Sequence, residues 1–292
     1  MSRPPIAVAA AIAAVVIVVA VAVVSRGSGE EKTLRETHEK LSEVRSGQLA
    51  MRFVIAPLSE ARDSDVGFAI KGRFALGRPG RLPDADLAYT QIAGPEQETV
   101  RIVSDGQAAW VRVGEQAYTL PRERTERLRR SADGDGGEGK GEGTGGLDAL
   151  RIDRWIADPK SSDGSEIDGV ATTRITGKLR VATALQDLLA LGRRAGTDVG
   201  AKPIGEETSE KLEDAKKGAS ITLHTGKDDR ILRRLRLRAS FPLERTRDLG
   251  GTIGRLRGAE VRFSLSLRRV GRAVRVERPA NPQPYSALSG GA

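Results

Sequence analysis

Hydrophobic and polar side chains alternate along most of the chain beyond residue 45, and a period of two predicts β-strands. The alternation is cleanest in Ile231–Phe241, where Leu235 and Leu237 are separated by arginine, and in Ala259–Val270. Other segments with this pattern are Met51–Ile55, Val66–Phe74, Asp86–Ile92, Gln97–Ser104, Gln107–Val113, Gln116–Leu120, Val170–Lys178, Ser220–Thr225 and Arg272–Arg278. We therefore predict an antiparallel sheet of about ten strands with one dry face and one strongly basic face.

A helical period of about 3.6 residues replaces the alternation in a few segments. In Thr33–Arg45 the apolar side chains share one side, and in Val181–Arg194 they cover a broad face that predicts deep burial. We also expect helices at Pro121–Arg130, around Leu150–Ile156 with Asp158-Pro159 as the stop, and at Gly205–Ala215, and a loop at Ser161–Ser165. Helices that cover one face of an antiparallel sheet give an α+β fold.

Large sheets curl, so the predicted fold is a curled sheet with the helices on its concave apolar face. This arrangement can enclose a cavity that accepts an acyl chain, but the same side chains can also pack into a solid core, and periodicity does not separate the two. For the cavity, the expected lipid-binding residues are Met51, Phe53, Ile55, Phe68, Ile70, Phe74, Leu185, Leu189, Leu235, Leu237, Phe263 and Leu265.

The nineteen residues Ile6–Val24 are eight Ala, eight Val and three Ile. As a helix this run is about 28 Å long, close to the hydrocarbon thickness of a bilayer, and it predicts one transmembrane helix in the plasma membrane. Arg3 precedes the run and Arg26 follows it, so the positive charges do not settle the orientation. The order of basic leader, apolar stretch and polar continuation is that of an export signal, which places the domain that follows outside the cytoplasm.

Two fates of this leader remain open. Ala20-Val21-Ala22 fits a cleavage site, which would give a secreted protein, but the apolar run exceeds the roughly 7–15 residues of a secretory signal. We therefore expect an uncleaved, single-pass anchor. The organisation is then an anchor or signal at 1–24, a linker at 25–31 and one domain at 32–292. Half of residues 131–146 are glycine, and we expect a disordered insertion there.

The chain carries 48 Lys and Arg against 39 Asp and Glu, which gives a net charge of +9. Outside the cytoplasm this charge fits anionic lipid headgroups or acidic glycans, and the compartment and few aromatic residues argue against nucleic acid. It fits arginines on solvated faces equally well, so charge alone selects no partner. The sequence contains no Cys. Disulfides, a thiolate nucleophile, a Cys metal site and lipid attachment through an N-terminal Cys are therefore excluded.

Candidate catalytic residues are sparse. The two histidines are His38, on the apolar side of the first helix, and His224, in a strand. Neither is accompanied in the sequence by a metal-ligand or catalytic motif, so we interpret both as structural. Asp228-Asp229 is interpreted as a turn. With no G-x-S-x-G and no H-E-x-x-H motif, we expect no enzymatic activity, no cofactor and no metal site.

Several motifs occur in a distinctive order. They are Asp105-Gly106 followed by Trp110-Val111 and Tyr118, then Asp168-Gly169, Ile175-Thr176-Gly177, a pair of long strands, and Val276, Pro279 and Pro282-Gln283-Pro284-Tyr285. In this order the chain resembles the LppX/LprG family of actinobacterial cell-envelope lipoproteins over residues 32–288. The resemblance implies a LolA-like half-barrel with a hydrophobic cavity for lipids or lipoglycans. The chain departs from the family in lacking the lipid-bearing Cys and in its glycine-rich insertion.

These observations predict a membrane-anchored, extracytoplasmic protein that carries or presents acyl-chain lipids in the cell envelope. The alternative is an envelope sensor or regulatory protein that uses the same half-barrel to bind a protein partner, which the sequence does not identify. Both functions fit one fold, since fold alone does not determine function.

Overall fold

The computed structural model describes residues 29–58, 65–77, 80–132, 150–194, 206–215, 217–241 and 258–289. The predicted transmembrane run Ile6–Val24, and residues 133–146 of the glycine-rich insertion, lie outside them. None of the helices in the described ranges is both long enough and apolar enough to cross a membrane.

The helices of the described residues are α1 (Gly29–Leu41), α2 (Arg122–Ala132), α3 (Ile152–Trp155), α4 (Val181–Arg194), α5 (Glu206–Ala215) and α6 (Ser286–Ser289). The strands are β1 (Ser46–Pro57), β2 (Val66–Ala75), β3 (Asp84–Ala93), β4 (Glu96–Asp105), β5 (Ala109–Val113), β6 (Gln116–Thr119), β7 (Ile156–Asp163), β8 (Thr172–Leu179), β9 (Lys217–Gly226), β10 (Leu232–Phe241), β11 (Ala259–Arg268) and β12 (Gln283–Pro284).

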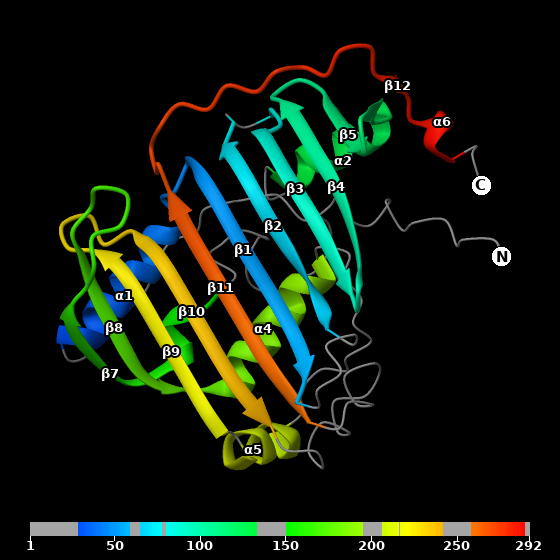
Figure 1. The fold of residues 1–292 in the computed structure, drawn as a ribbon. Helices are drawn as coiled ribbons and strands as arrows, with labels where there is room; N and C mark the ends of the chain where they lie inside the picture. Colours follow the sequence, from blue (N-terminus) through cyan, green and yellow to red (C-terminus); the bar gives the residue numbers. More distant parts are fainter. Residues whose placement is uncertain are drawn as a thin grey trace.

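These strands form one sheet in the order β12-β6-β5-β4-β3-β2-β1-β11-β10-β9-β8-β7 (Figure 1). Neighbours pair antiparallel throughout, except that β12 pairs parallel with β6. The first and last long strands, β1 and β11, pair along ten positions at the centre of the sheet and join its two halves. The antiparallel sheet of about ten strands that the sequence predicts is therefore close to the observed sheet.

The register separates the side chains of the sheet onto two faces. Met51 on β1 lies opposite Ile70 on β2 and Leu265 on β11, whereas the next residue, Arg52, points to the other side. Helices α1, α3, α4 and α5 cover the apolar face, because their buried side chains belong to the same hydrophobic cluster as those of the strands. The predicted α+β architecture, with helices on one apolar face of a large open sheet, is confirmed.

One edge of the sheet differs from the prediction. The predicted loop Ser161–Ser165 is wrong, because most of it belongs to β7, which pairs with β8. The helix expected to end at Asp158-Pro159 ends at Trp155 instead, and Ile156 already pairs with Leu179. The polar run that suggested a loop is compatible with a strand here because β7 is an edge strand exposed along one side.

The predicted strand Arg272–Arg278 is also wrong. Arg269 and Gly271 have positive φ angles of 49° and 78°, and they turn the chain away from β11. The segment then crosses the ends of the strands toward β12 (Figure 1). Arg278 holds it there by an ion pair with Asp105 and by lying 6.0 Å from the ring centre of Trp110.

Candidate functional site

The residues predicted to bind lipid come from β1, β2, β10, β11 and α4, and the structure brings them into one hydrophobic cluster. All of them belong to it: Met51, Phe53, Ile55, Phe68, Ile70, Phe74, Leu185, Leu189, Leu235, Leu237, Phe263 and Leu265. Phe53 lies opposite Phe68 on one side and Phe263 on the other, so the strand members occupy adjacent positions on the sheet. The sequence alternation therefore locates one continuous apolar layer.

This apolar layer is closed. None of the predicted lipid-binding residues is more than 4% exposed. Two aromatic residues that sequence reasoning missed also belong to the layer. The ring of Tyr89 stacks at 6.5 Å on Phe68, and the ring of Trp155 meets Phe263 edge-on at 5.9 Å. Because these side chains are buried, an acyl chain can reach them only if the residues that cover them move.

Polar contacts attach α4 to the elements beside it, among them a backbone hydrogen bond from Arg151 to Asp187. Trp155 Nε1 donates a hydrogen bond of 2.7 Å to Asp187 Oδ2, and the backbone N–H of Ala182 donates one of 3.0 Å to Glu213 Oε1 of α5. Burial raises the pKa of Asp187, and the hydrogen bond from Trp155 offsets this only in part. Helix α4 is thus held through side chains, whereas the strands under it are held by backbone ladders.

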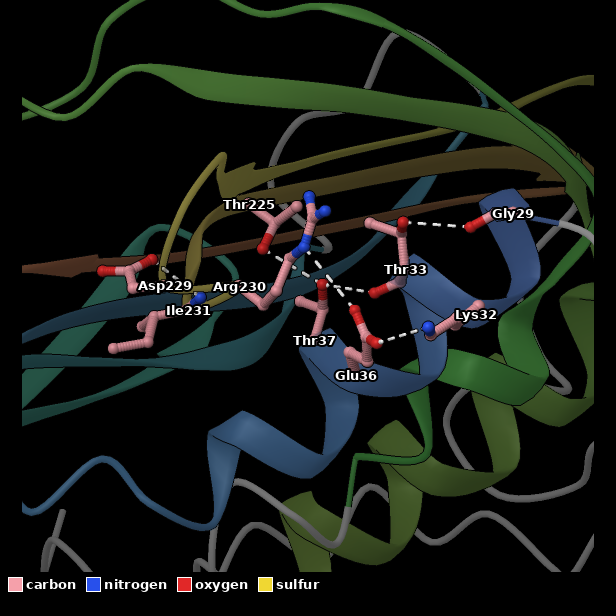
Figure 2. Close-up of polar contacts among 9 residues, drawn as sticks. All are labelled: Gly29, Lys32, Thr33, Glu36, Thr37, Thr225, Asp229, Arg230 and Ile231. Carbon is pink, nitrogen blue, oxygen red and sulfur yellow. Dashed lines mark hydrogen bonds and ion pairs between the residues drawn. The ribbon is translucent and has the colours of Figure 1, made fainter. Parts of the chain in front are cut away.

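Helix α1 is attached to the turn between β9 and β10 (Figure 2). The hydroxyl of Thr37 lies 2.8 Å from the carbonyl oxygen of Thr33 and 3.0 Å from the hydroxyl of Thr225, and both Thr37 and Thr225 are fully buried. Near the surface, Glu36 Oε2 lies 3.5 Å from Arg230 Nε. The buried hydroxyl pair is the contact that fixes α1 on the sheet, since exposed ion pairs contribute little.

Replacing Thr37 by Val is expected to lower the free energy of unfolding by about 1–3 kcal/mol, because it leaves the buried hydroxyl of Thr225 without this partner. The double variant Thr37→Val/Thr225→Val should recover most of the loss, since two apolar groups of similar shape then meet. Urea unfolding of the single and double variants measures the coupling. If the losses of stability of the two single variants simply add in the double variant, the two hydroxyls do not interact.

The opposite face of the sheet is basic, as the alternation predicts. Its exposed or half-exposed cations include Arg52, Lys71, Arg73, Arg101, Arg234, Arg236, Arg238, Arg262 and Arg268. Some are neutralised: Arg238 Nε lies 2.8 Å from Glu260, and Arg262 lies 3.2 Å from both Glu260 and Asp65. Within the part of the chain that the structure describes, no carboxylate pairs with Arg52, Lys71, Arg236 or Arg268.

Asp86 is the one buried carboxylate among these cations in the described residues. Its Oδ2 accepts hydrogen bonds from Arg101 Nη2 at 2.7 Å and from Arg73 Nη2 at 3.2 Å. Burial by itself would raise the pKa of Asp86, but the hydrogen bonds and charges of the two arginines outweigh it and hold the pKa below its usual value. Asp86 therefore stays ionised and neutralises part of the charge on β2 and β4.

Two grooves lie on this basic face. The first has a volume of about 670 Å³ and crosses β11, β1, β2, β3 and β4, with Asp86 in its lining. The second has a volume of about 520 Å³ and crosses β9, β10, β11 and β1. The alternation of the sequence predicts a basic face but not these grooves, because their shape depends on which strands become neighbours.

The two histidines lie in different parts of the sheet and its cover, on α1 and on β9. His38 is partly buried, as predicted, and its Nε2 lies 3.7 Å from Asp153, a carboxylate 115 positions away. His224 Nδ1 lies 3.3 Å from the hydroxyl of Thr172, and burial followed by the charges of neighbouring arginines lowers its pKa, which favours neutral imidazole. Asp229 accepts a hydrogen bond from the N–H of Ile231, as expected of a turn residue. Among the described residues no three His, Asp or Glu side chains are grouped to hold a metal.

The described residues thus define an open, largely antiparallel sheet whose apolar face is closed by helices and whose other face is basic. The chain is similar to LprF from Mycobacterium bovis, at 13% identity and TM-score 0.41, over 88% of this chain and 100% of that one. It is similar to the lipoprotein LppX from Mycobacterium tuberculosis, at 14% identity and TM-score 0.41, over 86% and 100%. A LolA superfamily protein from Nitrosomonas europaea matches at 9% identity and TM-score 0.21, over 85% and 96%.

LppX, which represents the family that the sequence resembles, is therefore among the solved structures similar to this chain. No protein-family model matches the chain, and no curated protein matches it.

Proposed function

We propose that the chain is a membrane-anchored, extracytoplasmic lipid-binding protein that holds acyl chains, of a lipid or lipoglycan, between its sheet and helix α4. It carries or presents them without catalysing a reaction. The observation that supports this proposal most strongly is the continuous apolar layer shared by β1, β2, β10, β11 and α4. The predicted anchor Ile6–Val24 would keep the domain beside the bilayer that supplies such lipids.

Binding in this proposal is an exchange of apolar contacts. When α4 separates from the sheet, side chains of the apolar layer that they share lose neighbours, and an acyl chain replaces them. Each buried methylene contributes about 0.8 kcal/mol, so eight contribute roughly 6 kcal/mol before the cost of ordering the lipid. The closed layer is then the lipid-free state, because its side chains are already buried.

Helix α4 is the element that we expect to move. Its attachments in the described residues are side-chain hydrogen bonds at Asp187 and Ala182, whereas moving a strand would break a ladder. Separation leaves the carboxylate of Asp187 without its hydrogen bond from Trp155 but exposes it to water, which hydrates it. The opening therefore needs less free energy than displacing part of the sheet would.

The test is photolabelling of the full-length protein in liposomes that contain a phospholipid with a photoreactive group near the end of one acyl chain. Mass spectrometry of the peptides should find label on β1, β11 and α4. Leu265→Trp, which adds bulk to the layer, should reduce this label by about fivefold or more, because the larger side chain occupies space that the acyl chain would take.

Val111→Trp is the matched control. Val111 is as fully buried as Leu265, but it belongs to a separate hydrophobic cluster around β5, so it should destabilise the protein without changing the label on β1, β11 and α4. Circular dichroism of each variant should give the spectrum of the folded, unchanged protein. Label confined to Ile6–Val24 would overturn lipid binding by the domain and would favour the alternative, an envelope sensor or regulator that binds a protein partner.

A further inference from the structure

The basic face carries exposed cations whose charge is not neutralised by any carboxylate of the described residues. Lys71 and Arg268 line the first groove, and Arg52 and Arg236 line the second. All four side chains are exposed. Because Lys and Arg keep their protons at neutral pH, both grooves retain a positive charge under physiological conditions.

Small residues between the cations make the face grooved instead of flat. Ala50, Ala88 and Ser266 stand in the same transverse row as Lys71 and Arg101, so the long side chains rise beside a low floor. The cationic walls of this first groove are Lys71, Arg73, Arg101 and Arg268. A ligand that follows this row therefore meets Lys71 and Arg101 along its path, and Arg73 and Arg268 stand two residues away in the next row.

The second groove continues the first across the sheet. On β11, Ser264 of the second groove is two residues from Ser266 of the first, and on β1, Arg52 is two residues from Ala50. The other cationic walls are Arg236, Arg238 and Arg262. Since paired strands lie about 4.8 Å apart, the two grooves together extend about 29 Å from β4 to β9.

We propose that these two grooves form one binding site for an extended acidic glycan, a linear sugar chain that carries carboxylate, phosphate or sulfate groups. Its anionic groups pair with Lys71, Arg268, Arg52 and Arg236, and its sugar backbone lies on the floor of small residues. The site is on the face opposite the apolar layer, so it is independent of lipid binding.

The shape of the site favours a glycan chain over a membrane surface. The sheet bends around the helices on its apolar face, so the basic face is the outer one, and a flat bilayer would touch only part of it (Figure 1). The cations also alternate with small residues along one transverse row, so an extended chain that follows the row meets positive charges at intervals. An array that docks on headgroups would instead present its charges outward in one plane.

Asp86 limits the affinity of the first groove, because it neutralises part of the charge of Arg73 and Arg101. Replacing Asp86 by Asn removes one negative charge from the groove lining and frees both guanidinium groups. The proposal therefore predicts that Asp86→Asn binds the glycan more tightly than the unchanged protein, by about threefold or more at low salt.

The experiment measures fluorescence anisotropy of labelled heparin oligosaccharides with the full-length protein in an uncharged detergent. One oligosaccharide is short enough for a single groove, and the other reaches from β4 to β9. The long one should bind about tenfold more tightly than the short one, because it engages both grooves. Lys71→Gln/Arg268→Gln and Arg52→Gln/Arg236→Gln should each weaken it by about fivefold or more and reduce its salt dependence.

Arg272→Gln/Arg275→Gln is the matched control, because both arginines are exposed, no carboxylate of the described residues pairs with them, and neither lines a groove. It should change the affinity by less than about twofold. Vesicles with and without phosphatidylglycerol, added to the same protein in neutral nanodiscs, test the membrane as partner. The proposal is overturned if the groove variants bind the long oligosaccharide as tightly as the control does, or if the long and the short oligosaccharide bind equally well. It is also overturned if replacing the four cations weakens binding to the vesicles but not to the oligosaccharide.

Discussion

Replacing Trp155 by Ala is expected to lower the free energy of unfolding by about 3–5 kcal/mol, the range for deleting a large buried aromatic side chain. Trp155 is completely buried and joins three elements. It ends α3, its ring meets Phe263 of β11 edge-on, and its indole N–H donates to Asp187 of α4. Its loss therefore opens a cavity under α4 and removes the hydrogen bond that attaches this helix.

Trp155→Phe separates these two effects. The ring still fills much of the space, but Asp187 loses the indole donor and keeps only the backbone hydrogen bond from Arg151, so a loss of about 1–3 kcal/mol is expected at pH 7. The hydrogen bond from Trp155 lowers the pKa of Asp187, whose net shift is upward because of burial. In the variant the pKa should rise further. A group with a raised pKa in the folded state weakens the protein as the pH rises through that pKa.

The destabilisation by Trp155→Phe should therefore be smaller in mild acid than at neutral pH, because protonated Asp187 no longer needs the donor. Urea unfolding at several pH values measures this difference. Trp110→Phe is the control, since Trp110 is also buried but contacts Arg278 in another part of the molecule. A loss from Trp155→Phe that is the same at every pH would contradict the role assigned to Asp187.

The two faces of the sheet could be predicted because they depend only on local alternation. Leu235 and Leu237 on one side, and Arg236 and Arg238 on the other, are separated by the pleat of a single strand, whatever its neighbours are. The same reasoning located the predicted lipid-binding residues in one layer. It also failed locally, at the edge strand β7 and in Arg272–Arg278, where pairing depends on the position of a distant strand.

The polar contacts that organise the site could not be predicted, because they join residues far apart in the chain. Thr37 and Thr225 are 188 positions apart, and Trp155 and Asp187 are 32 apart on different helices. Asp86 meets Arg73 and Arg101 only because β2, β3 and β4 pair in one register. The alternation therefore predicts which face is basic, but not which of its cations remain unneutralised.

Replacing Gly72 by Ala is expected to lower the free energy of unfolding by about 3 kcal/mol or more, among the largest effects of a single added methyl group. A Cβ at this position would overlap the carbonyl oxygen of Asp86 and lie 2.9 Å from the Cα of Leu87. Both atoms belong to the backbone of β3, so no side-chain rotation relieves the overlap. The two strands would have to separate where β2 and β3 pair.

Gly29→Ala is the control, because nothing lies within 4 Å of a Cβ added there, at the start of α1. It should change the stability by less than about 0.5 kcal/mol. Thermal unfolding of both variants measures the difference. Gly72 and Asp86 also line the first groove, so the shift of β3 should move Asp86 relative to Arg73 and Arg101 and change oligosaccharide binding in any folded Gly72→Ala protein. A stable variant with unchanged binding would show that β2 and β3 do not approach each other this closely.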